Sequence, residues 1–135
     1  MSPGASPAGG TGHCVLRHDP GTHIVRATFI GTMDLDAFAR CAGDAVSFAT
    51  RHGSVRILFD DRESQARVLA SDIYRMPSRA EQEGLTPGHR IAVLYTTRTR
   101  EPMDMLLWEN VFVNRGYRAR AFVDEDQALR WLSQE

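Results

Sequence analysis

Lysine is absent from this chain of 135 residues, so all sixteen of its basic side chains are arginines. The absence excludes every mechanism that needs a lysine amine, such as one that passes through a Schiff base. The formal net charge is −1, so the chain has no overall positive field to attract nucleic acid or an anionic membrane surface. We expect no nucleic-acid partner.

Cysteine is scarce as well. Cys14 and Cys41 are the only two, and they form no CxxC pair, so neither a zinc knuckle nor a thioredoxin-type motif is available. Two isolated thiols in a chain that can build a core suit a reducing compartment. We expect no metal, no cofactor and a cytoplasmic location.

Long apolar runs are missing too, and none approaches the ~20 residues of a membrane span. The first residues lack a basic segment followed by an apolar core, so we expect no signal peptide. Residues 1–12, MSPGASPAGGTG, are rich in Pro, Gly, Ser and Ala and predict a disordered tail. Residues 13–135 have an ordinary content of hydrophobic and charged residues and predict a single domain.

The first half of the chain predicts a hairpin, a helix and a strand. Apolar residues recur over 13–17 and alternate over 23–30, and the Asp-Pro-Gly turn between these segments predicts an antiparallel pair. Asp34 is a good N-cap for a helix that runs to about Arg51. A short apolar run over 55–59 then predicts a third strand.

The segment 65–85 is the least regular part of the sequence. Ser71 is a candidate N-cap for a helix that begins there. Pro77 removes a hydrogen bond from any regular helix that contains it. We therefore expect either two short helices or one kinked helix.

Apolar runs at 90–95 and 118–123 predict two more strands. Pro102 suits the first turn of a helix between them, and Asp124 with Gln127 suits the start of a final helix. The resulting order is ββαβαβαβα. It predicts an α/β fold with a mixed, mostly parallel sheet of about five strands, right-handed crossovers and about four helices.

Three segments have a recognisable pattern: RILFDDR at 56–62, GHRIAVLY at 88–95 and NRGYRARAFVDEDQALRWL at 114–132. With the element order, they resemble the STAS-type fold of anti-sigma-factor antagonists, and most closely its SpoIIAA-like branch of small bacterial proteins. The resemblance covers about residues 13–134. It implies a STAS-like domain that acts in regulation through protein–protein recognition.

Phosphorylation-switched STAS antagonists carry an Asp-Ser-Ser-type motif before their second helix, and a Ser of that motif is phosphorylated. The corresponding stretch here, VLASD at 68–72, has Ser and Asp in the reverse order and no neighbouring Ser. The switch is therefore not carried over by the resemblance. Ser71 is interpreted first as a helix cap and only second as a phosphorylation site.

Acidic residues follow the strand that ends at Phe59, in the sequence ILFDDRES. Ligands of α/β sheets favour the carboxyl ends of parallel strands. Adjacent residues of an extended chain point opposite ways, so Asp60 and Asp61 do not readily chelate one ion. Asp60 is therefore interpreted as structural, with a ligand-binding rim as the alternative. The candidate ligand-binding residues are Asp60, Arg62, Ser71, Thr96, Thr97, Arg98 and Arg100.

His13, His18 and His23 recur every five residues, and hairpin strands can bring such side chains together around a metal ion. Their places at strand ends and in a turn favour solvent-exposed roles instead. We expect no metal site and no catalytic residue.

The helix after Pro102 is apolar over a wide arc and is interpreted as a core helix. Such a helix would also line a pocket for an apolar ligand, or form the face of a homodimer, and SpoIIAA-like proteins are described alongside lipid-binding folds. We predict a non-catalytic regulatory or protein-interaction module. The alternatives are a small-molecule or lipid-binding domain with an apolar cleft beside the Trp108 helix, and a small enzyme with Asp60 and the loop 96–100 at its rim.

Overall fold

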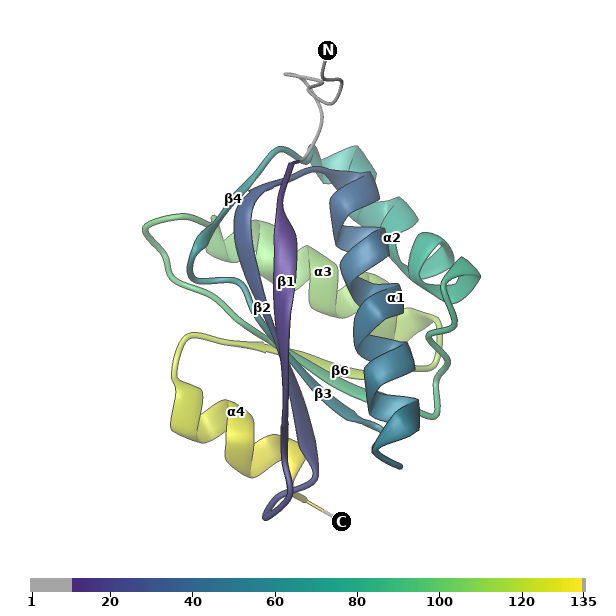
Figure 1. Ribbon diagram of the computed structural model, residues 1–135. Coiled ribbons are helices and arrows are strands. Elements are labelled where there is room, and N and C mark those ends of the chain that lie inside the picture. Colours follow the sequence, from purple (N-terminus) through teal and green to yellow (C-terminus); the bar gives the residue numbers. More distant parts are fainter. Residues whose placement is uncertain (1–10, 135) are drawn as a thin grey trace.

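The computed structural model describes residues 11–134, so residues 1–10 of the predicted tail lie outside the described part of the chain. After an initial hairpin, strands and helices follow one another around a twisted sheet (Figure 1). In chain order the elements are β1 (His13–Asp19), β2 (Ile24–Met33), α1 (Leu35–Arg51), β3 (Arg56–Asp60), β4 (Ser64–Ala66), α2 (Ala70–Gln82), β5 (Arg90–Leu94), α3 (Pro102–Asn114), β6 (Arg118–Phe122) and α4 (Glu125–Leu132).

The sheet has the strand order β1-β2-β3-β5-β6, and the short β4 also pairs with β2. The β1–β2 pair is antiparallel, and every other pair is parallel. The mixed, mostly parallel α/β sheet expected from the element order is therefore confirmed. The structure adds β4, whose three residues are too few to show an alternating pattern in the sequence.

Strand β2 reaches β4 because it changes direction near its end. Gly31 has a φ of +89°, a conformation that glycine adopts without the steric cost a Cβ would bring. Before this point, Ile24 to Thr28 pair with β3. From Gly31 to Met33 the strand pairs with β4 instead. The segment that follows Asp60 is thereby held against the sheet at the carboxyl ends of the parallel strands.

Helices cover both faces of the sheet, but unequally. α1, α2 and α3 pack on one face, and α4 lies apart from them on the other (Figure 1). Alternate residues of each strand supply the two cores, as the pleat requires. The first core includes Val25, Ala27, Phe29, Ile57, Phe59, Ile91 and Val93. The second includes Ile24, Leu58, Ala92, Leu94, Phe122, Ala128 and Leu132.

Two of the three predicted helix caps are confirmed. The Asp34 carboxylate accepts from the Ala37 N–H at 2.8 Å and begins α1, and Asp124 accepts from Gln127 N–H at 3.0 Å and begins α4. The third was wrong, because α2 begins one residue earlier than Ser71 and its N-cap is Leu69. The Leu69 N–H donates to the Asp72 carboxylate at 2.9 Å. The Asp72 carboxylate thus satisfies the N–H of the N-cap residue, while Leu69 has no side-chain oxygen to accept from the first turn.

Pro77 does not divide α2, which runs without interruption from Ala70 to Gln82. Of the two expected alternatives, two short helices or one kinked helix, the first is therefore excluded. Pro77 is among the fully buried side chains of the protein. Its burial, together with Ile73 and Ala80 on the same face, contributes apolar packing that offsets the backbone hydrogen bond lost at a helical proline.

Candidate functional site

The two adjacent acids at the end of β3 point to opposite faces of the sheet. Asp60 lies on the α4 side and Asp61 lies on the side of α1, α2 and α3. Both side chains are only 4% exposed. The sequence argument that these neighbours cannot share a ligand agrees with this geometry, since each carboxylate has arginine partners of its own.

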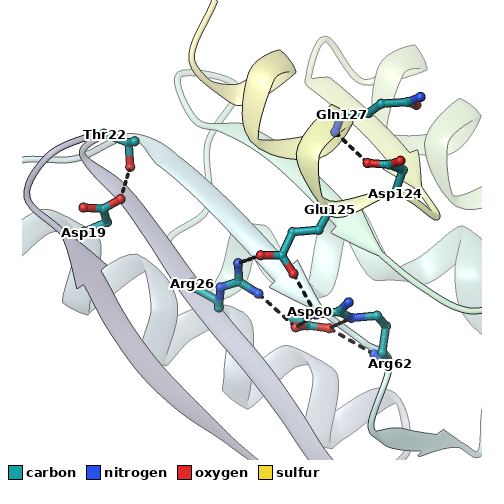
Figure 2. Close-up of polar contacts among 8 residues, drawn as sticks. All are labelled: Asp19, Thr22, Arg26, Asp60, Arg62, Asp124, Glu125 and Gln127. Carbon is teal, nitrogen blue, oxygen red and sulfur yellow. Dashed lines mark hydrogen bonds and ion pairs between the residues drawn. The ribbon is translucent and has the colours of Figure 1, made fainter.

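Asp60 belongs to a four-residue ion-pair network that Figure 2 shows in close-up. Its carboxylate accepts from Arg26 of β2 at 3.0 Å and from Nε and Nη2 of Arg62 at 2.9 Å each. Glu125, the first residue of α4, accepts from Arg26 at 2.8 Å and from Arg62 at 3.0 Å. The network therefore ties the end of β3 to β2 and to the start of α4.

The charges in this network favour the ionised acids. Burial opposes ionisation of Asp60, but the hydrogen bonds and charge of Arg62, together with the charge of Arg26, outweigh it and hold the pKa of Asp60 below its ordinary value. The hydrogen bond from Arg26 is the main cause that lowers the pKa of Glu125. Both acids are thus stably charged at neutral pH.

Asp61 forms a second network on the other face. Arg100, from the loop before α3, donates from Nε and Nη2 to the two Asp61 carboxylate oxygens at 2.6 Å each. Arg100 also donates to the Ser64 hydroxyl at 2.8 Å and to the Thr99 carbonyl at 3.0 Å, while Ser64 donates to Asp61. The Arg100 side chain is 7% exposed, so this is a bidentate pair withdrawn from solvent.

Burial controls the ionisation of Asp61. It raises the pKa of this carboxyl above its ordinary value, even though the charge of Arg100 and the Ser64 hydroxyl act in the opposite direction. Asp60 and Asp61 are neighbours in sequence, yet their environments shift their pKa values in opposite directions. A raised pKa in a pocket also occurs at functional sites, and it directs attention to the space beside Asp61.

A cavity of about 250 Å³ lies between the sheet and the layer formed by α1, α2 and α3. Its walls are largely apolar, and Asp61 and Arg100 lie among the polar residues that line it. Aromatic rings make close contacts around it, with Phe29 5.6 Å from Phe59 and Trp108 4.9 Å from Phe112 between ring centroids. The apolar and aromatic residues that line it include Phe29, Phe38, Phe59, Met105, Trp108 and Phe112.

The polar lining of the cavity comes mostly from the loop before α3 and the start of that helix. Thr99, Arg100, Glu101 and Asp104 lie there, close to the end of β3 where Asp61 is. The cavity therefore combines apolar walls with a polar rim at the carboxyl ends of the strands, the region where α/β sheets commonly bind ligands.

The sequence-predicted site residues are not all brought together. Asp60 and Arg62 share one network, and Arg100 belongs to the other, across the sheet. Thr97 and Arg98 are exposed in the loop after β5. Ser71 is exposed in the first turn of α2. Thr96, also a candidate, is half-buried in the loop after β5 and accepts from the Arg98 N–H at 3.4 Å.

Several residues of the two networks were not predicted. Asp61 was not among the candidate site residues, and its partner is Arg100, which lies 39 positions further along the chain. Arg26 could have been suspected, because an arginine inside the apolar run of a central strand must find a partner. Nothing in the local sequence indicated Ser64 or Glu125, since tertiary packing alone places them.

The three histidines of the hairpin do not converge. His18 Nε2 lies 3.3 Å from His23 Nδ1, and the His18 ring stacks on His52 with 4.3 Å between centroids, whereas His13 is exposed at the start of β1. Within residues 11–134, His, Cys, Asp and Glu side chains form no group of three that could hold a metal ion.

Replacing Asp60 with Asn is expected to lower the free energy of unfolding by about 2 kcal/mol at pH 7, because charge-assisted hydrogen bonds from two arginines are weakened. The pKa of Asp60 is lowered in the folded protein, so its contribution is present above the ordinary Asp pKa and is lost as the pH falls through the folded-state value. Urea unfolding at pH 7 and pH 3 measures both effects. Glu125→Gln, at a carboxylate 38% exposed, is the control and should cost under about 1 kcal/mol. An equal loss in the two variants would contradict the claim that Asp60 contributes more to stability than Glu125 does.

Comparison with solved structures identifies the fold. The chain is similar to an uncharacterised protein of the DUF3478 family with a SpoIIAA-like fold from Shewanella loihica PV-4, with a TM-score of 0.57 and 12% sequence identity over 98% of each chain. No family model matches the sequence, and no curated protein matches it. The SpoIIAA-like fold expected from the resemblance is thereby confirmed. In the part of the chain described by the structure, no helix has the length and apolarity needed to cross a membrane.

Proposed function

We propose that this protein is a non-catalytic binding domain whose ligand is an apolar small molecule held between the sheet and α1, α2 and α3. The cavity of about 250 Å³ beside α3 carries this proposal. A packed core contains few voids larger than a water molecule. A lining of aromatic and aliphatic side chains with a few polar groups at one end is the usual composition of a small-molecule site.

The volume of the cavity limits the size of the ligand. An engineered apolar cavity of about 150 Å³ binds benzene, and pockets for drug-sized molecules begin at about 300 Å³. A cavity between these values suits a compound of two or three aromatic rings or a medium-length acyl chain. A complete phospholipid is too large to be enclosed.

The polar end of the cavity favours an uncharged ligand. Arg100 donates to Asp61, Ser64 and Thr99, and Arg79 is paired with Asp36 at 2.6 Å. At Arg100 an anionic head group would have to displace the buried Asp61 carboxylate, whereas Asp36, the partner of Arg79, is 69% exposed. Such an exchange is costly when the existing pair is bidentate and desolvated.

Binding of the neutral probe N-phenyl-1-naphthylamine tests the proposal. We expect a Kd of about 10 µM, from about 0.3 kcal/mol per heavy atom and a modest aromatic contribution. Energy transfer to the probe should be most efficient from Trp108, which lines the cavity, and weaker from Trp131, which packs against the second core on the other face of the sheet. Trp108→Phe should therefore reduce the transfer more than Trp131→Phe does.

A cavity-filling variant supplies the decisive comparison. Ala42 lines the cavity from α1, and Ala42→Phe should weaken probe binding by at least about tenfold by occupying the space. Val123, 57% exposed between β6 and α4, gives the matched control, since Val123→Phe adds the same ring outside the cavity. If a folded Ala42→Phe protein binds the probe as the wild type does, or the wild type binds none, the proposal fails.

The outer face of α3 supports a second candidate function, a regulatory module that recognises a protein partner. Met103 is 72% exposed, Leu106 48% and Val113 47%, so one helix carries apolar side chains toward both core and solvent. An exposed apolar stripe of this kind is typical of interaction surfaces. It would serve a partner protein or a second copy of this chain equally well.

A further inference from the structure

The two cysteines lie on neighbouring elements that run side by side. Cys14 is on β1, the edge strand of the sheet, and Cys41 is on α1, which packs on that strand. Both side chains face the same apolar core, in which Cys41 is buried and against which Cys14 packs. They are the only cysteines in the chain, so each thiol has one possible partner within the molecule.

Contacts between β1 and α1, before and after the two cysteines, set the alignment of the strand and the helix. Before them, Arg40 donates to the Gly12 carbonyl at 3.4 Å. Beyond them, His18 stacks on His52 at the end of α1, with 4.3 Å between ring centroids. Four residues of a strand span about 14 Å and eleven residues of a helix about 16 Å. The two elements are therefore aligned along this whole length, and Cys14 and Cys41 lie within the aligned stretch.

The two thiols differ in accessibility. Cys41 is buried, with 2% of its surface exposed, whereas Cys14 is only half-buried. An oxidant from solvent therefore meets Cys14 first. Cys41 lies behind it in the core against which Cys14 packs, where it is shielded from the oxidant.

We propose that Cys14 and Cys41 form a peroxide-sensitive pair, in which Cys14 is oxidised first and Cys41 resolves it as an intramolecular disulfide. The Cys14 thiolate attacks one peroxide oxygen, the O–O bond breaks, and the departing hydroxide takes up a proton to become water. Cys41 then attacks the sulfur of the Cys14 sulfenic acid and gives up its proton, and a second water leaves. Two thiols and one hydrogen peroxide thus yield one disulfide and two waters.

The effect of each thiol on the pKa of the other agrees with Cys14 as the first thiol to be oxidised. A hydrogen bond with Cys41 lowers the pKa of Cys14, because it stabilises the thiolate, although burial acts in the opposite direction. The same hydrogen bond, with burial, raises the pKa of Cys41. The accessible sulfur is therefore the better nucleophile toward peroxide. In a reducing compartment, a bond of this kind would be transient and would serve to sense oxidants.

The test treats the full chain with a small excess of hydrogen peroxide and follows it by intact mass and by thiol counting in denaturant. The wild type should lose both thiols together and the mass of two hydrogen atoms, while it remains a monomer. Its Tm should rise by about 10 °C, because the bond closes a loop that contains β2. Cys41→Ser should instead stop at a sulfenic acid on Cys14, trapped by dimedone.

Three results would overturn the proposal. One is oxygen addition to Cys14 in the wild type without a cross-link, and another is a disulfide only between chains. The third is a cross-linking rate in the folded protein no higher than in urea, because the packing of β1 on α1 would then make no contribution. Cys14→Ser is the matched control, and its buried Cys41 should react at least about tenfold more slowly than Cys14 does in Cys41→Ser.

Discussion

Replacing Arg100 with Met is expected to lower the free energy of unfolding by about 3–5 kcal/mol at pH 7. The reason is that Asp61, whose side chain is 4% exposed, would remain buried without its bidentate partner. Breaking a buried ion pair from one side leaves an uncompensated charge and costs far more than the pair contributes. Methionine keeps much of the volume of the side chain, so lost packing is a minor part of the effect. Urea unfolding followed by circular dichroism measures it.

The loss should depend on pH in a defined direction. Burial already raises the pKa of Asp61 in the wild type, and removing Arg100 raises it further. A carboxyl whose pKa is raised by folding favours the folded state when protonated, and this advantage disappears as the pH rises through the folded-state pKa. Arg100→Met should therefore cost little near pH 4 and its full amount at pH 7. A loss that is equal at both pH values would contradict a buried, unpaired Asp61.

Two further variants separate charge from packing. Asp61→Leu combined with Arg100→Met removes both charges, and it should recover most of the stability lost in the single variant. Arg62→Met removes an arginine from the other network, where the side chain is 39% exposed and Asp60 keeps Arg26. We expect it to cost about 1 kcal/mol.

Leu58→Ala is expected to lower the free energy of unfolding by about 3 kcal/mol. Leu58 is fully buried beneath α4, in the smaller of the two cores. The substitution removes three carbon atoms and leaves a cavity that rigid strands on either side cannot fill. Trp131 packs against this core, so its fluorescence should change in the variant while that of Trp108, on the other face, stays the same.

The control for Leu58 is Val55→Ala, at a side chain 51% exposed just before β3, which should stay within about 0.5 kcal/mol of the wild type. Probe binding in the cavity should also be unchanged in Leu58→Ala at a temperature where the protein is folded. A loss under about 1 kcal/mol would mean that α4 is loosely packed, in disagreement with the burial of Leu58.

Local sequence patterns were enough to predict the order of the long elements and the mixed sheet. Asp34 and Asp124 mark helix starts through hydrogen bonds to residues three positions away, and such signals are local. β4 was missed because Ser64–Ala66 becomes a strand only through its pairing with the bent end of β2. Local sequence could not decide whether Pro77 divides its helix, since its burial among tertiary neighbours outweighs a local preference.

The site was predictable only in outline. The opposed directions of Asp60 and Asp61 follow from the geometry of an extended chain, and the apolar arc of the Trp108 helix already indicated a pocket as an alternative. The pairing of Asp61 with Arg100 joins segments 39 positions apart, and no short-range pattern encodes it. The placement of Cys14 and Cys41 against the same core depends on the packing of a helix on an edge strand, and local sequence does not indicate it either.

The opposed acids at the end of β3 have a consequence for ligand affinity. The peptide unit between Asp60 and Asp61 is held by an arginine network on each face, and the Asp61 N–H donates to the Leu94 carbonyl at 2.8 Å. The end of a strand is normally less ordered than its middle, because backbone pairing stops there. The peptide unit at the end of β3, however, cannot rotate without breaking the ion pairs of Asp60 or those of Asp61. The cavity wall next to it is therefore preorganised. A ligand that enters has little loop conformational entropy left to remove, and more of its contact energy is retained as affinity.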